Sequence, residues 1–460
     1  MNVFWSLVFV AVIGAVPGIV LTRSLHIGLA VAPAVTLVTA AVGGTVATAL
    51  SVSATRCILA LALVANLTAI GYAALRWRRG EKSGVSWSAA GFGVFTWYAL
   101  PTIVVLAAFP AAPTEWDSRS IWWFHASWFY AGGATVRRGI LEPLLSYSHP
   151  DYPPGVPAAT ATLWHVTQRG RDLWLAQSLT GVLTALAIAG LATSLLVGRR
   201  DPVKLGAVSA LSLAAVGLAA GAAAHGYVDV LCAALLVASL VGFMSLSDQR
   251  LALLVGGVTL AAAAVTKNEG LVFGVLVVAV AVGFSAHKRL ATAVTGLVAL
   301  SPAVAWQLAV RSTGAHIEGD VSPGGILHAG SSVFRSRFWE ALRAVGHETY
   351  LYLGPAAAVL ALLLVLARLE PARSRLVRKE LRLVVVLVLA AFLTAFGIAG
   401  IYAIGIRDVA WWVASSLVRV SATPKLFALT ALAVAARPVM AICADRSVIT
   451  NGAAEVTVPS

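Results

Sequence analysis

The sequence is poor in charged residues, in cysteine and in motifs for nucleotide or zinc binding. Charged residues make up 11% of the 460 positions, against about a quarter in a soluble domain, which argues against a water-soluble protein. The three cysteines, Cys57, Cys232 and Cys443, lie in apolar runs and offer neither a disulfide framework nor the spacing of a zinc site. A P-loop, a GxGxxG turn after a strand and an HExxH helix are also absent. A nucleotide-driven pump and a zinc protease therefore have no support.

Hydrophobic residues make up 59% of the chain and gather in runs long enough to cross a bilayer. A spanning helix needs about 20 predominantly apolar residues, and about thirteen runs approach this length. They cover residues 3 to 22, 27 to 51, 57 to 75, 87 to 109, 173 to 197, 204 to 223, 228 to 246, 251 to 266, 270 to 285, 290 to 310, 349 to 367, 383 to 404 and 424 to 444. Alternating segments of the barrel type are missing. The sequence therefore predicts an all-α polytopic integral membrane protein with about 11 to 13 transmembrane helices.

Basic residues are concentrated in short loops between the apolar runs. In a soluble protein the net charge of +14 would suggest nucleic acid, but in a membrane protein it indicates which loops face the cytoplasm, and no nucleic-acid partner is expected. The segments predicted to be cytoplasmic are residues 76 to 82, 199 to 200, 287 to 289 and 368 to 382. This orientation places the N-terminus outside, the C-terminus inside, and two long hydrophilic segments, 110 to 172 and 311 to 348, on the extracytoplasmic face. The first apolar run is expected to be a retained helix, because no cleavage pattern follows it, and the polar tail 445 to 460 is expected to be disordered.

The first long loop carries two groups of ionisable residues. Glu115 and Asp117 lie among tryptophans directly after an apolar helix, where carboxylates are suited to acid/base or metal chemistry. The alternative is an interfacial helix anchored by tryptophan, in which Asp117 is merely solvated. Further along, four prolines between 150 and 157 stiffen a segment that holds His149, Asp151 and Tyr152. The alternative there is a stiff surface loop without a binding role.

Other charged residues fall at helix ends on the same predicted face. Asp229 begins an apolar run, Lys267 and Glu269 interrupt another, and Arg407 and Arg419 flank a pair of tryptophans. Such residues are functional candidates because the bilayer penalises ionisable groups. The ordinary alternatives are a turn with a local Lys/Glu pair for Lys267 and contact with lipid phosphate for Arg419. The cytoplasmic loops contain no comparable group, so we expect the functional chemistry on the extracytoplasmic side.

In their order along residues 87 to 425, these residues resemble the bacterial GT-C glycosyltransferases. The pattern comprises Glu-Trp-Asp at 115 to 117, His-Pro-Asp-Tyr-Pro at 149 to 153, Tyr-Val-Asp at 227 to 229, Lys-Asn-Glu-Gly at 267 to 270, and a late Trp-Trp followed by Ser415, Ser416 and Arg419. Within that superfamily the chain is similar to the protein O-mannosyltransferase-like branch, glycosyltransferase family 39, which uses polyprenyl-phosphate sugars. The resemblance implies a GT-C-like bundle with a large first extracytoplasmic loop that bears interfacial helices.

The resemblance also implies roles for individual residues. Asp117 would be the general base on the acceptor hydroxyl, while Lys267 and Arg419, with Arg407 as a weaker match, would bind the donor phosphate. Cations are suited to that place because a lipid-linked donor holds its phosphate at the headgroup layer and charge develops there as the phosphate departs. The residues expected to bind substrate are Glu115, His149, Asp151, Tyr152, Asp229 and Glu269. No cofactor is assigned, but Glu115 and Asp117 could together hold a divalent cation.

The chain is expected to divide into five parts. These are N-terminal accessory transmembrane helices (1 to 82), a catalytic transmembrane core (83 to 310) that includes the loop 110 to 172, a second extracytoplasmic loop (311 to 348), C-terminal transmembrane helices (349 to 444) and a cytoplasmic tail (445 to 460). The first part is set apart because the family's catalytic loop follows its first helix, whereas three apparent helices precede it here.

The sequence thus predicts an inverting glycosyltransferase of the bacterial plasma membrane. It would move a sugar from a polyprenyl-phosphate donor to an extracytoplasmic hydroxyl of a glycan, lipid or protein, among membrane lipids. The abundance of Ala, Val, Leu, Arg and Gly is typical of a GC-rich bacterial genome, for which mannose or arabinofuranose is a plausible sugar. The alternative is a transporter or flippase of an anionic lipid or glycan, which would place functional charges at the membrane midplane and on both faces. The grouping of charges on one predicted face favours the enzyme.

Overall fold

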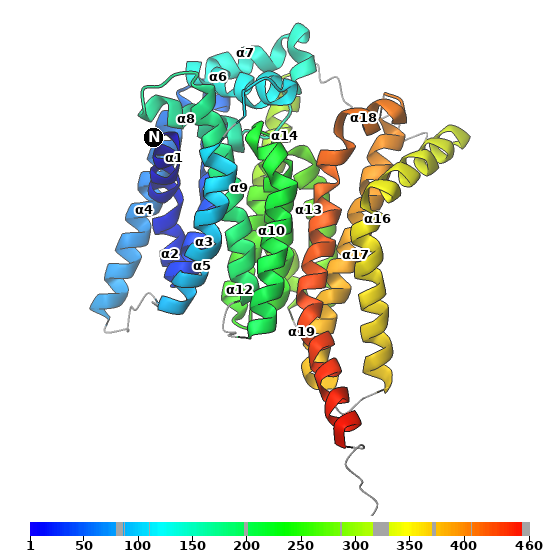
Figure 1. Cartoon of the computed structure of the whole chain (residues 1–460). Coiled ribbons are helices and arrows are strands. Elements are labelled where there is room, and N and C mark those ends of the chain that lie inside the picture. Colours follow the sequence, from blue (N-terminus) through cyan, green and yellow to red (C-terminus); the bar gives the residue numbers. More distant parts are fainter. Residues whose placement is uncertain are drawn as a thin grey trace, which may run out of the picture.

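The computed structural model is a bundle of helices that run between two ends of the molecule (Figure 1). It describes residues 1–79, 86, 88–109, 111–196, 201–285, 288–315, 331–369, 374–405 and 407–452. The elements of the first part are α1 (Asn2–Val10), η1 (Ala11–Ala15), α2 (Val16–Thr22), α3 (Leu25–Leu50), α4 (Ala54–Arg78), α5 (Ala89–Ile103), η2 (Val104–Ala108), η3 (Ser118–Trp122), α6 (Trp123–Ala131), α7 (Gly133–Leu141), η4 (Pro143–Ser148) and α8 (Gly155–Val166). The later elements are α9 (Leu173–Leu196), α10 (Pro202–Ala224), α11 (Asp229–Ser245), α12 (Gln249–Ala264), α13 (Asn268–Phe284), α14 (Arg289–Ser312), α16 (Ser332–Leu369), α17 (Ser374–Ile404), α18 (Val409–Val420) and α19 (Ala422–Gly452).

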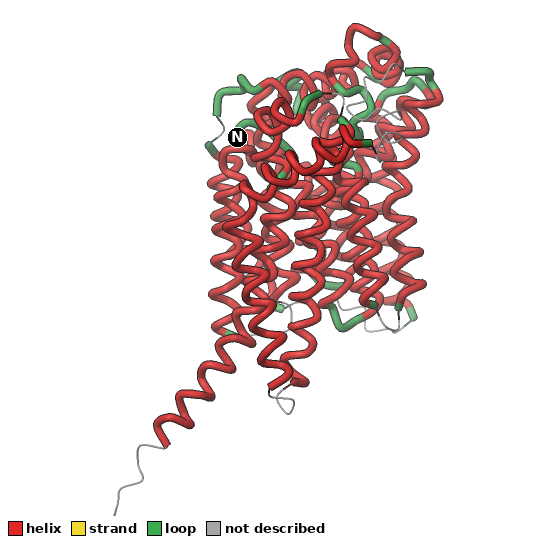
Figure 2. The backbone as a smooth tube through the Cα atoms, turned by 90° about the vertical axis from the view of Figure 1, so that its right-hand side faces the viewer, coloured by secondary structure: helices red, strands yellow, loops and turns green. Residues whose placement is uncertain are grey.

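The helical pattern confirms the prediction of a polytopic membrane protein. In the described part of the chain, 10 helical segments are long and apolar enough to cross a membrane. Three shorter apolar helices, α11, α12 and α13, pack among them. The described residues form no strand, and Figure 2 shows red helices joined by green loops. This agrees with the requirement that backbone polar groups in lipid be satisfied within each segment.

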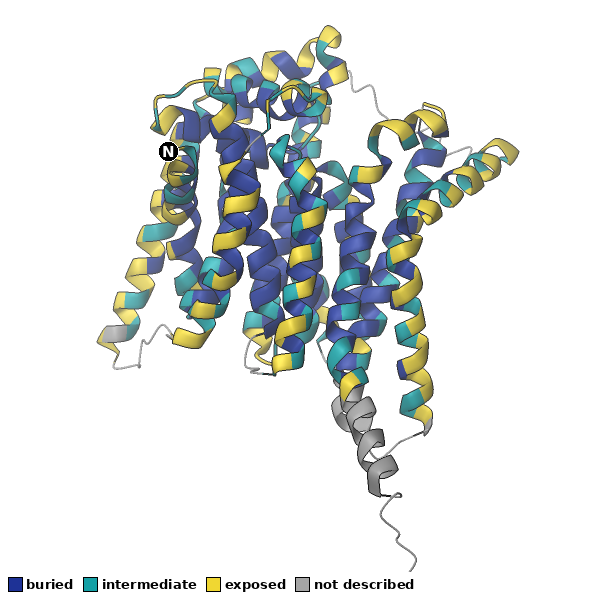
Figure 3. Cartoon of the chain, in the orientation of Figure 1, coloured by how far each residue is buried: buried dark blue, intermediate teal, exposed yellow. Residues whose placement is uncertain are grey.

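Burial separates a central helix from helices that face outward (Figure 3). In α9, 94% of the most apolar window is buried, and this helix contacts α3, α5, α10 and α11. By contrast, α4 exposes Leu63, Val64 and Leu67 on its outer side. A run of exposed apolar side chains along a helix is unfavourable in water and favourable against lipid. The outward helices therefore present the surface that a bilayer requires.

Two glycines of α9 allow neighbouring backbones to approach closely. A Cβ atom at Gly181 would lie 2.3 Å from the Leu106 carbonyl oxygen, and one at Gly190 would lie 2.7 Å from that of Ala30. Small residues at such contacts favour packing between spanning helices. The two glycines therefore let α3, and η2 at the end of α5, pack tightly against α9 at the centre of the bundle.

The helices alternate in direction, so each connection lies at one of two ends (Figure 1). We call the end with Met1 and the segment 111–172 the loop end. The opposite end, where α4 finishes at Arg78, α14 begins at Arg289 and α16 reaches Arg368, is called the basic end. The segments predicted to share a face thus do lie together, as far as they fall within the described residues. Residues 80 to 82, 199 to 200, 287 and 370 to 373 of the basic segments lie outside them.

The first long loop folds into short helices across the loop end. Figure 1 shows α6, α7 and α8 over the spanning helices, and α8 contacts α3 and α6. The N-terminal helices, predicted to be accessory, are part of the same bundle, because α1 and α3 both contact α9. The loop residues are therefore held against a continuous helical base.

Two boundaries differ from those predicted. Helix α16 begins at Ser332, so much of the segment predicted as a second loop is the start of a long helix, which projects from the bundle in Figure 1. Residues 316 to 330 of that loop lie outside the described residues. Helix α19 continues to Gly452, into the segment predicted as a disordered tail. Both helices extend beyond their apolar runs because hydropathy detects the lipid-embedded part of a helix and not its polar extension.

Candidate functional site

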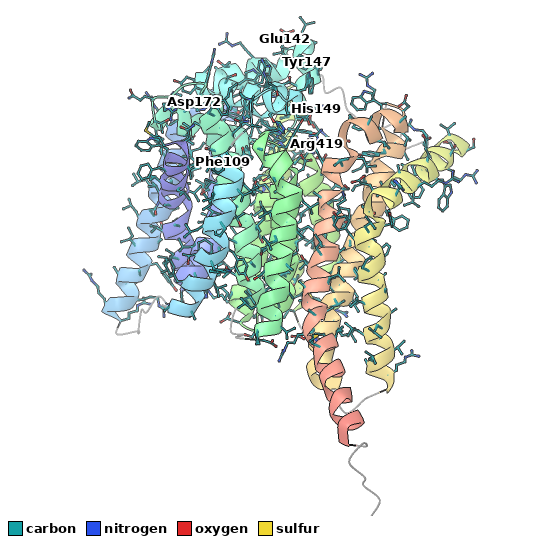
Figure 4. The ribbon with its side chains drawn as sticks, viewed as in Figure 1. Phe109, Glu142, Tyr147, His149, Asp172 and Arg419 are labelled. Atoms are coloured by element: carbon teal, nitrogen blue, oxygen red, sulfur yellow. The ribbon has the colours of Figure 1, made fainter. Side chains whose placement is uncertain are left out.

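A group of charged side chains from separate elements meets at the loop end of the bundle. Its members, named here the charged cluster, are Glu115, Asp117, Asp229, Lys267, Glu269 and Arg419. Asp229 opens α11, Lys267 immediately precedes α13, and Arg419 lies in the last turn of α18. The alternating direction of the helices brings these termini to one end, where they meet Asp117 just before η3. Figure 4 shows Arg419 at this end, together with His149 from the first long loop.

The charged cluster has an outer ion pair, Arg419 with Asp117, and an inner ion pair, Lys267 with Asp229. The Asp229 carboxylate also lies near Arg419 and so links the two pairs. Arg419 Nη1 lies 2.6 Å from Asp117 Oδ2 and 3.7 Å from Asp229 Oδ2. Lys267 Nζ lies 2.8 Å from Asp229 Oδ1 and 2.9 Å from Glu269 Oε1. The side chain of Asp117 is 26% exposed and that of Asp229 only 4%. The outer pair is thus open to a ligand, whereas the inner pair is closed and fixes the positions of both cations.

Tyr227 joins Arg419 to the remaining carboxylate of the charged cluster. The guanidinium carbon of Arg419 lies 4.1 Å from the centre of the Tyr227 ring, which is a cation–π contact. The Tyr227 hydroxyl donates a hydrogen bond to Glu115 Oε2 at 3.0 Å. Burial raises the pKa of Tyr227 well above its ordinary value, and Asp117 and Glu115 add to the effect while Arg419 opposes it. The phenol therefore stays protonated and holds Glu115 beside the outer pair.

The proline-rich segment is hydrogen-bonded to α14 and to the first residue of α13, which directly follows Lys267. Asn268 Nδ2 donates to Asp151 Oδ2 at 2.7 Å, and the side chains of Trp306 and Gln307 each donate to the Asp151 carbonyl at 2.9 Å. Gln307 also donates to Asn268 Oδ1 at 2.9 Å. Burial raises the pKa of Asp151 above its ordinary value, against the opposing effects of His149 and the Asn268 hydrogen bond. This network holds the loop next to the charged cluster.

His149 and Tyr152 form an aromatic border on the same segment. His149 has a left-handed backbone, with φ at 53°, and its ring stacks on Tyr152 at a centroid distance of 5.1 Å. The Tyr152 ring lies 5.4 Å from that of Trp122 in η3. Aromatic faces next to carboxylates are a common surface for ligands with both apolar and hydroxyl groups.

Arg407 lies apart from this arrangement. It is exposed at the start of α18, and its guanidinium lies 5.6 Å from the centre of the Trp411 ring. Asp408 caps the helix by accepting a hydrogen bond from the Trp411 backbone N–H at 2.7 Å. Within the described contacts, none joins Arg407 to the charged cluster. Of the three cations predicted to bind phosphate, Lys267 and Arg419 are thus the two that come together.

The two carboxylates predicted to hold a divalent cation, Glu115 and Asp117, contact different partners. Glu115 contacts Tyr227 and lies 3.9 Å from His225 Nδ1, whereas Asp117 contacts Arg419. Within the described residues, no three His, Cys, Asp or Glu side chains gather in a way that could hold a metal ion. The carboxylates instead offer acceptors for hydroxyl and ammonium groups.

Sequence reasoning missed the polar side chains that hold the site in place. Tyr227, Asn268, Trp306 and Gln307 were not assigned a role, although each contacts a predicted residue. The available signal was Trp306 followed by Gln307 within the apolar run of α14. A polar amide in a spanning helix needs a partner there, because lipid offers none.

A second group of charges contradicts the expectation that only one face carries them. At the basic end, Arg437 Nε of α19 lies 2.5 Å from Asp201 Oδ2, and its Nη1 lies 3.1 Å from Glu380 Oε1. The acids belong to the start of α10 and to α17. In the sequence they stand beside Arg199, Arg200 and Lys379, and no role was predicted for them. Their pairing with α19 depends on helix packing, which the local sequence does not reveal.

Comparison with known proteins gives no relative. No protein-family model, no curated protein and no solved structure matches the chain.

Proposed function

We propose that the protein is a membrane glycosyltransferase that uses a polyprenyl-phosphate sugar and acts at the loop end. The observation that carries this proposal is the charged cluster, in which a partly exposed carboxylate, Asp117, touches a cation, Arg419, beside the buried Lys267. A lipid-linked donor needs cations for its phosphate and a base for the acceptor at the same membrane surface. The charged cluster supplies both within contact distance.

The proposed reaction is a direct displacement at the anomeric carbon. Asp117 accepts the proton of the acceptor hydroxyl, and the hydroxyl oxygen forms a new bond to that carbon. The bond from the anomeric carbon to the phosphate oxygen breaks, and polyprenyl phosphate leaves with the electron pair. Arg419 and Lys267 stabilise the negative charge that develops on the phosphate. Attack opposite the leaving group inverts the configuration of the sugar.

Binding of the donor must rearrange the outer ion pair. The charged cluster contains four carboxylates and two cations, so a phosphate gains nothing unless a carboxylate gives way. Asp117 is the carboxylate in a position to do so, because it is more exposed than Asp229 and is hydrogen-bonded to Arg419 alone among the described residues. We infer that the phosphate replaces Asp117 on Arg419. The released carboxylate then becomes a stronger base.

The remaining side chains fit the recognition of a sugar. Glu115, Asp151 and Glu269 provide carboxylate acceptors for sugar hydroxyls. The rings of Trp116 and Tyr147, 6.0 Å apart and both exposed, offer apolar faces close to Asp117. These residues are proposed to bind the donor sugar and the acceptor.

The loop end is proposed to face the outside of the bacterial plasma membrane. This orientation follows from the Lys and Arg residues at the basic end, since such residues are enriched in cytoplasmic loops. A reporter enzyme fused between α4 and α5 tests it. Activity of a cytoplasm-specific reporter is expected, and activity of a periplasm-specific reporter would reverse the orientation.

The proposed activity is tested by transfer of radiolabelled sugar from a panel of polyprenyl-phosphate sugars to membrane acceptors. Purified wild-type protein is compared with Asp117→Asn and with Glu142→Gln, which removes one negative charge elsewhere at the loop end. We expect transfer by the wild type and by Glu142→Gln, and a loss of at least about a hundredfold in Asp117→Asn. Equal transfer by all three proteins would exclude Asp117 as the base.

One observation favours a second candidate, the transport of an anionic lipid or glycan. Arg437 and its partners at the basic end give the molecule paired charges at both ends, as a transport path would require. Against it, the buried charged side chains of the described residues lie near the two ends, with none in the middle of the bundle. Movement of a fluorescent lipid-linked sugar across vesicles that contain the protein, without transfer, would favour this alternative.

A further inference from the structure

We propose that a groove between α12 and α14 at the basic end binds the head group of an anionic phospholipid. The groove has a volume of about 610 Å³ and is lined by Gln249, Arg250, Leu253, Leu254 and Thr295. It lies at the end of the molecule opposite the charged cluster. The proposal does not depend on the activity of that cluster.

The groove has a polar part at the start of α12, here called its mouth, and an apolar part at Leu253 and Leu254, here called its floor. Gln249 and Arg250 belong to the first turn of α12, and both are exposed. Leu253 and Leu254 follow about one turn deeper, since an α-helix rises about 5.4 Å per turn. Thr295 contributes from α14. This order along α12, from an exposed arginine to half-buried leucines, matches the order of a phosphate and an acyl chain in a lipid.

The mouth of the groove is electrically positive. Helices α12 and α14 both begin at this end, so their N-termini add partial positive charge to that of Arg250. Lys288 and Arg289 stand at the start of α14. Asp248 is the nearby acid, and its carboxylate is engaged by its own helix, accepting a hydrogen bond from the Leu251 N–H at 2.9 Å. The charge balance at the mouth favours an anion.

A second arginine borders the same part of α12. Arg23, at the end of α2, donates to the Tyr72 hydroxyl of α4 at 2.9 Å, and Arg250 is a neighbour of the same hydroxyl. Two arginines and a phenol thus stand together at the membrane surface. Arginine is suited to phosphate because its planar donors can bind two oxygens at once.

The occupant inferred from these features is a lipid and not a free anion. A soluble phosphate would use the arginines but would leave the leucine floor in contact with water. An anionic phospholipid covers both surfaces, with its phosphate at Arg250 and an acyl chain along Leu253 and Leu254. Each basic residue near an anionic membrane surface contributes about 1 kcal/mol to such binding.

The test is native mass spectrometry of the purified, delipidated full-length protein. It is titrated with phosphatidylglycerol, with phosphatidylcholine or with inorganic phosphate. The variants are Arg250→Gln, which removes charge from an exposed position, and Leu253→Trp, which fills the floor. The control is Arg138→Gln, which removes an exposed arginine from α7 at the loop end. Size-exclusion chromatography verifies that each variant is folded.

We expect the wild type to bind phosphatidylglycerol most tightly. The affinity for this lipid should fall about fivefold in Arg250→Gln, should also fall in Leu253→Trp, and should be unchanged in Arg138→Gln. Phosphatidylcholine, which carries no net charge, should bind the wild type, Arg250→Gln and Arg138→Gln equally. Wild-type affinity of folded Arg250→Gln for phosphatidylglycerol would overturn the proposal, even if Leu253→Trp failed to fold. Inorganic phosphate that binds as tightly and displaces the lipid would show a site for free anions and would overturn it as well.

Discussion

Replacing Asp117 by asparagine should tighten the binding of a lipid phosphate to the protein. In the wild type, Asp117 is the closest carboxylate to Arg419, at 2.6 Å, and a phosphate must compete with it. Asparagine has nearly the same shape but carries no charge. Arg419 would then keep only the more distant carboxylate of Asp229, at 3.7 Å.

The size of the effect follows from the exposure of the pair. Two unit charges 4 Å apart interact by about 4 kcal/mol at an effective dielectric constant of about 20. The side chains of Asp117 and Arg419 are 26% and 19% exposed, so desolvation and solvent screening remove much of this energy. A net contribution of about 1.4 kcal/mol is reasonable for a charge-assisted hydrogen bond in such a place. The affinity for the phosphate should therefore rise about tenfold.

The assay is isothermal titration calorimetry with dodecyl phosphate as the probe, at low ionic strength and in a non-ionic detergent. Glu142→Gln is the control for the loss of one negative charge at the loop end and should bind as the wild type does. Arg419→Ala should bind less tightly than either. Unchanged or weaker binding by Asp117→Asn would refute the competition between carboxylate and phosphate. It would do so whether or not the protein transfers sugar.

Three further predictions concern stability and its dependence on pH. Lys267→Met should lower the free energy of unfolding by about 3–5 kcal/mol, because it leaves the carboxylates of Asp229 and Glu269 without their shared cation; a second change, Asp229→Asn, should restore part of the thermal stability. His125 is buried and its pKa is lowered to about 3, chiefly by burial. The wild type should therefore lose stability as the pH falls from 6.5 towards 3, by up to about 1.4 kcal/mol per pH unit. In melting curves recorded over this range, the stability of His125→Gln should depend less on pH, and an unchanged slope would contradict the reasoning. The pKa of Asp151 is raised, so its contribution to stability is present at low pH and is lost as the pH rises through its pKa in the folded protein. Asp151→Asn should remove this loss of stability, and an equal loss in the variant would assign it to another group.

The sequence was informative about the helices because the bilayer restricts the possible structures. Each predicted apolar run coincides with a helical segment, since a chain in lipid has to satisfy its backbone groups internally. The grouping of basic segments at one end could also be predicted, because successive spans must alternate in direction. The start of α16 at Ser332 could not, because a polar helical extension has no hydropathy signal.

The candidate residues could be placed on one face but not paired. Asp117 and Arg419 are 302 positions apart in the sequence, and nothing local relates them. Arg407 and Arg419 were both predicted to bind phosphate, with Arg407 the weaker match. Only Arg419 contacts the carboxylates in the described part of the chain, because the two arginines stand at opposite ends of α18. The same holds for Arg437, whose partners come from two other helices.

The sequence by itself therefore determined that this is a polytopic helical membrane protein and that the candidate residues of the loop end share one face. It did so because hydropathy and charge are properties of short segments. The tertiary structure alone decided which carboxylate meets which cation, that Asp229 and Lys267 are buried while Asp117 remains open, and that a second group of charges closes the opposite end. Those properties depend on how each helix is rotated and where it ends against its neighbours, and only the packing of the whole bundle sets these.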